Sequence, residues 1–126
     1  MENTIDLHTH TVKSDGTFLP DDLLRLAESQ NLSILSITDH ESVDAYYDMD
    51  RSLFSGKIIP GIELRTSCFG IAIELLGYGF DIDKMKETIK KFLDMYEEIK
   101  PEETAFKNFL EYWLEYDIND TYYTLL

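Results

Sequence analysis

The stretch Asp6-Leu7-His8-Thr9-His10 lies near the N-terminus of the chain. Side chains alternate between the two faces of a β-strand, so His8 and His10 are expected to project from one face while Thr9 points away. Two imidazoles placed in this way can share one cation. Residues 4–7 are expected to form a short buried strand. This would set the histidine pair at a carboxyl end, where parallel sheets and barrels carry their chemistry.

Outward from this stretch, the residue pattern predicts strands that alternate with helices. Pro20 suits the first position of a helix, and Asn31 can end that helix in the left-handed conformation. The apolar residues of 33–38 lie on both sides of an extended segment, as expected of a parallel strand covered on both faces. The expected elements are a strand over 4–7, a helix over 20–31, a strand over 33–38, a helix over 42–56, and strands over 57–66 and 70–79.

The C-terminal part of the chain has a different pattern. The last two strands are joined by a short loop, which predicts a hairpin and not a helix-bridged pair. From Asp83 apolar residues recur at helical spacing up to Pro101, and a second helix is expected to follow. Its aromatic stripe, Phe106, Phe109 and Trp113, is typical of a core or an interface. The sequence thus predicts an α/β fold of about four strands with two C-terminal helices.

Length and charge limit the function classes. With 126 residues the chain forms one domain, but an α/β barrel typically needs about 250. The net charge is −14, from 25 acidic and 11 basic residues. Nucleic-acid modules usually show a basic face, so a broad phosphate-binding surface is not expected. Bound divalent cations would offset part of the negative charge.

The sequence carries no pattern typical of export or membrane insertion. The single cysteine, Cys68, excludes an internal disulfide and fits a reducing compartment. The N-terminus lacks the basic start and apolar run of a signal peptide, and no apolar stretch approaches about 18 residues. We therefore expect a soluble, cytoplasmic protein.

Metal-ligating residue types gather where the expected strands end. All three histidines lie at such ends, Glu63 follows the third strand, and Asp15 lies in the first loop. Imidazole nitrogen together with carboxylate oxygen suits Zn, Mn or Fe more than Ca or Mg. A lone histidine at a strand end is usually an ordinary hydrogen-bonded residue, but chance alone rarely places all three histidines of a chain at strand ends. Asp39 would face away from His40, which predicts a supporting hydrogen bond and not ligation.

The first eighty residues resemble the N-terminal part of the PHP (polymerase and histidinol phosphatase) family of metal-dependent phosphoesterases. The resemblance implies a distorted barrel, here partial or truncated, whose strand ends hold up to three divalent ions and hydrolyse phosphate esters. The motifs that carry it are Asp6-Leu7-His8-Thr9-His10-Thr11, Ser14-Asp15-Gly16, Ile37-Thr38-Asp39-His40, Ile59-Pro60-Gly61-Ile62-Glu63 and Leu75-Leu76-Gly77-Tyr78-Gly79.

The resemblance also implies roles for single residues. Glu74 occupies the position of a family histidine, and a carboxylate there can still bind a metal. Asp15 and His40 are in addition candidate catalytic residues. The family completes its site with a further histidine and an Asp-x-His pair from the second half of the barrel, and this chain has no histidine after His40. The metal-binding positions that the resemblance assigns are His8, His10, Asp15, His40, Glu63 and Glu74.

Three hypotheses follow. The first is a phosphoesterase that acts on a phosphorylated small molecule or a nucleotide, with Lys13 or Arg65 as further candidates to balance phosphate charge. The second is a degenerate, non-catalytic module that binds metal or a partner, and the third is a fragment of a larger PHP enzyme. Residues 1–80 would form the metal-binding half-barrel. Residues 81–126 would pack on it or on a partner, and a homodimer is one way to complete the barrel.

Overall fold

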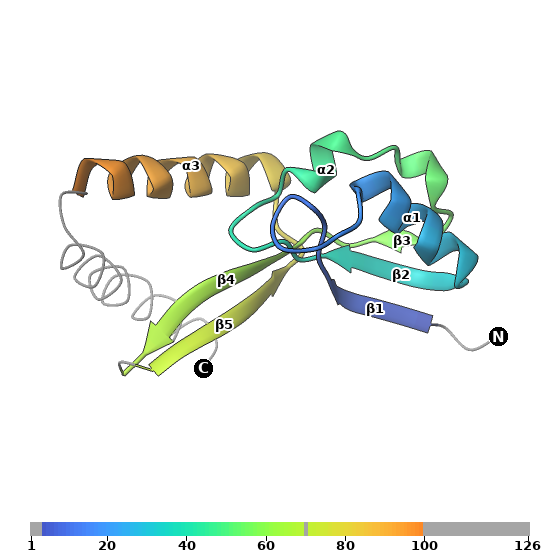
Figure 1. Cartoon of the computed structure of the whole chain (residues 1–126), viewed down its shortest axis with the longest axis horizontal. Coiled ribbons are helices and arrows are strands. Elements are labelled where there is room, and N and C mark those ends of the chain that lie inside the picture. Colours follow the sequence, from blue (N-terminus) through green and yellow to red (C-terminus); the bar gives the residue numbers. More distant parts are fainter. Residues whose placement is uncertain (1–3, 70, 100–126) are drawn as a thin grey trace.

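The structure is a computed structural model, and it describes residues 4–69 and 71–99. Three parallel strands form one sheet in the order β1-β2-β3, and β4 pairs with β5 as an antiparallel hairpin. Figure 1 shows the hairpin diverging from the parallel sheet, with α1 and α2 on one side of that sheet. The elements are β1 Thr4–Thr9, α1 Pro20–Ser29, β2 Leu32–Ile37, α2 Ala45–Asp48, the 3-10 turn η1 Arg51–Leu53, β3 Lys57–Ile58, β4 Gly61–Cys68, β5 Ile71–Tyr78 and α3 Ile82–Ile99.

The core lies between the parallel sheet and the short helices. Helix α1 is amphipathic because its apolar residues recur at helical spacing, and it buries Leu23, Leu24 and Ala27 against the sheet. Leu35 and Ile37 of β2 are almost fully buried beside them. Asn31 ends the α1 segment with a positive φ of 54°, as the sequence predicts. The mixed α/β class is confirmed, but the described residues form two sheets and not a closed barrel.

Strand β1 is exposed, and the expectation of a buried strand over 4–7 is wrong. Its residues from Thr4 to His8 are all exposed, including Ile5 and Leu7. The reason is its place at the edge of the sheet, where β2 is its hydrogen-bonded neighbour. An apolar residue at an edge stays in contact with water unless another element covers it.

Two other elements also differ from the expectations. The segment 57–66 is not one strand, because Pro60 has no N–H to donate: Ile59 N still donates to Leu35 O of β2, and β4 begins only at Gly61. The expected helix over 42–56 is reduced to α2 and η1. Met49 is extended between them, and the side chain of Asp50 accepts a hydrogen bond from Ser52 N, which starts the new turn.

The C-terminal helix packs on the core with its first turns. Residues Ile82, Met85 and Ile89 of α3 lie against the core cluster. The second expected helix and the tail, residues 101–126, lie outside the described residues. Within the ranges that the structure describes, no helix is both long and apolar enough to cross a membrane.

Tyr46 ties the end of β2 to the start of β4. Its buried hydroxyl donates to the carbonyl of Ile37 and accepts from Gly61 N at 2.7 Å. Burial raises the pKa of the Tyr46 phenol, and backbone hydrogen bonds to Gly61 and Ile37 partly oppose this. At Gly61 there is no room for a larger residue, because an added Cβ would lie 2.1 Å from Ser36 Oγ.

We expect Tyr46→Phe to lower the free energy of unfolding by about 1–3 kcal/mol, because it leaves buried backbone groups without their partner. Urea denaturation followed by circular dichroism measures this. Tyr47→Phe is the matched control, since Tyr47 is exposed. Equal stability of the two variants would contradict the proposed role of the Tyr46 hydroxyl.

Candidate metal centre

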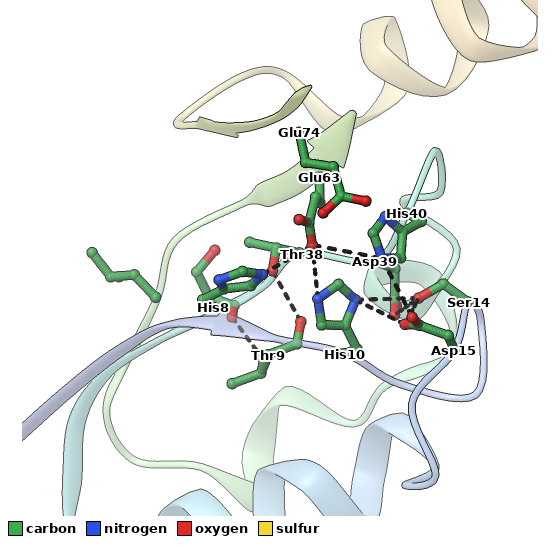
Figure 2. A network of polar contacts seen from close by, with 12 residues as sticks. His8, Thr9, His10, Ser14, Asp15, Thr38, Asp39, His40, Glu63 and Glu74 are labelled. Atoms are coloured by element: carbon green, nitrogen blue, oxygen red, sulfur yellow. Dashed lines mark hydrogen bonds and ion pairs between the residues drawn. The ribbon is translucent and has the colours of Figure 1, made fainter. Parts of the chain in front are cut away.

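Glu63 is the centre of the candidate site. One of its oxygens, Oε2, lies 2.9 Å from the Nε2 atom of His8 and 2.9 Å from the Nε2 atom of His10. The glutamate is 4% exposed, so its carboxylate is shielded from water on most sides. Figure 2 shows both imidazoles turned toward this carboxylate from β1 and the residue that follows it.

Backbone pairing places Glu63 beside His40. The two residues form an isolated parallel bridge, in which Glu63 N donates to Asp39 O and Glu41 N donates to Glu63 O. The start of β4 therefore continues the parallel sheet next to the end of β2. This pairing brings residues 23 positions apart to one edge, which is the carboxyl end of the parallel strands.

The histidine pair depends on an irregular β1. The pairing with β2 shifts register between Asp6 and Thr9, and such irregularities re-aim side chains near functional sites. His8 N donates to Asp6 Oδ1 at 3.1 Å, while Thr9 Oγ1 points to β2 and donates to Ser36 O. The rings of His8 and His10 are 5.2 Å apart between centroids.

Asp15 lies between the other two imidazoles. Its Oδ1 atom is 3.3 Å from His10 Nδ1 and its Oδ2 atom is 3.4 Å from His40 Nε2. The rings of His10 and His40 stack with centroids 4.8 Å apart. Gly16 lets the loop approach this closely, because a Cβ there would lie 2.4 Å from the backbone of His10.

Asp39 points away from the cluster and into the first loop. It is 1% exposed, and it accepts hydrogen bonds from Thr11 N, Thr11 Oγ1 and Ser14 Oγ at 2.6–2.7 Å. Ser14 Oγ also lies 3.4 Å from His10 Nδ1. Asp39 thus holds the loop that carries Asp15. The sequence predicts no separate role for Thr11 and Ser14, which appear there only as members of the motifs that carry the resemblance.

The remaining candidates lie around this centre. Glu74 of β5 groups with His40 and Glu63, although its side chain is about half exposed. Arg65 is paired with Glu74 across the hairpin, with Nε and Oε1 3.9 Å apart. Lys13 forms an ion pair with Asp48 of α2, so its charge is already offset there.

The donor atoms fit a divalent metal. In three overlapping groups, one nitrogen or oxygen per residue lies within 4.8 Å of the others. Burial alone raises the pKa of Glu63, but the hydrogen bond with His8 and the charges of His40 and His8 outweigh it and hold the pKa below its usual value. The buried Nδ1 atom of His40 has no hydrogen-bond partner in the described part of the chain. The groups are His8, His10 and Glu63; His10, Asp15 and His40; and His40, Glu63 and Glu74.

The sequence is similar to bacterial exoribonucleases. No protein-family model matches it. It is 35% identical over 81 residues to the 5'-3' exoribonuclease Rnm of Salmonella typhimurium and to that of Escherichia coli, covering 61% of this chain and 28% of each relative. It is 30% identical over 93 residues to a 5'-3' exoribonuclease of Haemophilus influenzae, covering 70% of this chain and 33% of the relative. The chain thus spans a third or less of the length of these relatives.

Solved structures show a similar fold. An amidohydrolase from Chromobacterium violaceum superposes with a TM-score of 0.61 at 23% identity, over 71% of this chain and 33% of that protein. A protein from Bifidobacterium adolescentis, to which metal-dependent phosphoesterase activity has been ascribed, gives 0.60 at 21% identity, over 73% and 34%. The chain therefore has the same fold as part of these hydrolase-like structures, and its sequence is similar to part of the exoribonucleases.

Proposed function

We propose that this chain carries the metal-binding part of a divalent-metal-dependent phosphoesterase. The single observation that carries the proposal is the convergence of three imidazoles and three carboxylates in overlapping groups around Glu63. Glu63 and His40 come from one sheet edge, and His8 and His10 from another strand, so only the fold assembles the set. The similarity to exoribonucleases supports a phosphodiester of RNA as the substrate class to test first.

The residues would divide the work as follows. His8, His10, Asp15, His40, Glu63 and Glu74 would hold Zn, Mn or Fe, metals that accept mixed nitrogen and oxygen ligands. When bound, these ions would acidify a water molecule and offset phosphate charge. Asp15 would hold a metal ion with one carboxylate oxygen and take up the proton of the water with the other, while His40, whose Nε2 atom lies 3.4 Å from Asp15 Oδ2, would act through the metal ion that it holds. Asp39 would keep the loop of Asp15 in place.

We also propose a division of the chain into a partial barrel over 1–80 and a C-terminal part over 81–126. The described strands leave β1 with an exposed edge, which a further strand or a covering element would satisfy. A second copy of the chain is one candidate for this cover. Size-exclusion chromatography with light scattering tests it, and a monomer at all concentrations would exclude a homodimer.

A second candidate function is a metal-binding module without catalysis. It is favoured by the histidine count, because the resemblance implies further ligands from the second half of a barrel. This chain has three histidines, and none follows His40. In this case the protein would bind metal with no turnover of any phosphate ester.

The proposed function predicts at least one bound ion per chain after purification without chelator. Elemental analysis by mass spectrometry counts the ions. Hydrolysis of bis(4-nitrophenyl) phosphate and of a 5'-labelled single-stranded RNA, each in Mn, Zn or Fe, then tests the reaction, and excess chelator should abolish it. Less than one ion per chain would end the proposal, whereas bound metal without hydrolysis would favour the non-catalytic module.

A further inference from the structure

Arg65 lies on the hairpin beside the candidate metal centre. It is two residues beyond Glu63 on β4, and alternation along a strand places the two side chains on the same face. Its register partner across the hairpin is Glu74, which belongs to the group with His40 and Glu63. The guanidinium therefore borders the cluster on the side of the hairpin.

The backbone of Arg65 is fixed while its side chain is accessible. Arg65 N donates to Glu41 Oε1 at 2.6 Å, and Glu41 directly follows His40. The side chain is 64% exposed, and its Nε atom is 3.9 Å from Glu74 Oε1. An exposed ion pair of this kind contributes little free energy. The guanidinium can therefore leave Glu74 and pair with another anion with little loss of free energy.

Three other cations of the described chain are engaged elsewhere. Lys13 pairs with Asp48, Arg25 with Asp22 and Lys86 with Asp44. The cluster itself is rich in carboxylates, which would repel a phosphate. A guanidinium offers several N–H donors in a planar fork that matches phosphate oxygens, so Arg65 is suited to oppose this repulsion.

We infer that Arg65 binds the non-bridging oxygens of the phosphate group that occupies the site. The inference rests on the proposed function, because it takes the substrate to be a phosphate ester. It assigns to Arg65 the binding of substrate and not the chemical step. A replacement should therefore raise KM and leave kcat nearly unchanged.

The experiment compares Arg65→Gln and Arg65→Lys with Arg25→Gln, which removes the same charge from an exposed ion pair on α1. With bis(4-nitrophenyl) phosphate, Arg65→Gln should raise KM about tenfold, the effect of losing one charge-assisted hydrogen bond. Arg65→Lys should restore part of the loss, since lysine keeps the charge without the fork. The metal content of each variant shows whether the loss of the Arg65–Glu74 ion pair disturbs metal binding. Thermal midpoints show whether each variant is folded.

A second measurement separates the two proposals. Isothermal titration with inorganic phosphate reports binding without turnover, and Arg65→Gln should weaken it about tenfold relative to Arg25→Gln. If the wild type does not hydrolyse the ester but shows this difference, the proposed function fails and the role of Arg65 stands. Equal KM or equal phosphate affinity in the two glutamine variants, or no phosphate binding by the wild type, would overturn the role of Arg65.

Discussion

Replacing Glu63 with glutamine is expected to lower the affinity for divalent cations by about 100-fold or more, since even residues that only support ligands cost 10–100-fold. Glutamine keeps the shape of the side chain and removes the charge. In the wild type, one Glu63 oxygen lies 2.9 Å from both His8 Nε2 and His10 Nε2. Glu63 is 4% exposed, so the change removes a buried charge next to both imidazoles. Titration with Mn or Zn by calorimetry measures the affinity.

The matched control for this prediction is Glu87→Gln. Glu87 pairs with Lys91 on the exposed surface of α3, so the same chemical change there should leave metal affinity within about twofold. If Glu63→Gln binds metal as tightly as Glu87→Gln, the site is not organised around Glu63, and the proposed function loses its main support.

Asp39→Ala is expected to lower the free energy of unfolding by about 3 kcal/mol or more, because it removes a buried charged acceptor from three donors. Thr11 N, Thr11 Oγ1 and Ser14 Oγ would remain without their partner. The loop of Asp15 should loosen as a result, with a loss of about tenfold or more in metal affinity. Urea denaturation and metal titration measure the two effects.

Asp48→Ala is the control for Asp39, since Asp48 is about half exposed and pairs with Lys13 on the surface. We expect it to change stability by less than about 1 kcal/mol. If the two variants lose a comparable free energy of unfolding, Asp39 contributes no more to stability than a surface carboxylate. A stable Asp39→Ala variant with wild-type metal affinity would contradict the role of Asp39 altogether.

Local patterns were sufficient to predict much of the fold. The helix that begins at Pro20 and stops before Asn31, the hairpin of β4 and β5, and the start of the C-terminal helix all follow from signals within a few residues. Properties that depend on distant parts were not predictable in this way. The exposure of β1 depends on which elements lie beside it. The break after α2 involves a contact with α1, because Asp50 N donates to Asp21 Oδ1, 29 positions away.

In the candidate site, too, local signals could be predicted and long-range contacts could not. The histidines and Glu63 could be singled out because metal-ligating residue types at strand ends are a local signal. That Asp39 holds Thr11 and Ser14 could not be foreseen, since these contacts join residues 25–28 positions apart. Nor does the sequence show that one oxygen of Glu63 meets two imidazoles. That geometry follows from the bridge between His40 and Glu63, which forms only in the folded chain.

The contacts of Glu63 also join two sheets, because His8 belongs to the parallel sheet and Glu63 to the hairpin. A cation held by both would cross-link them, and any ligand that binds only the native state shifts the folding equilibrium by mass action. At a free metal concentration of 100 times Kd, the gain is about 2.7 kcal/mol. The melting temperature should therefore climb with the logarithm of metal concentration, and the hairpin and the parallel sheet should melt together.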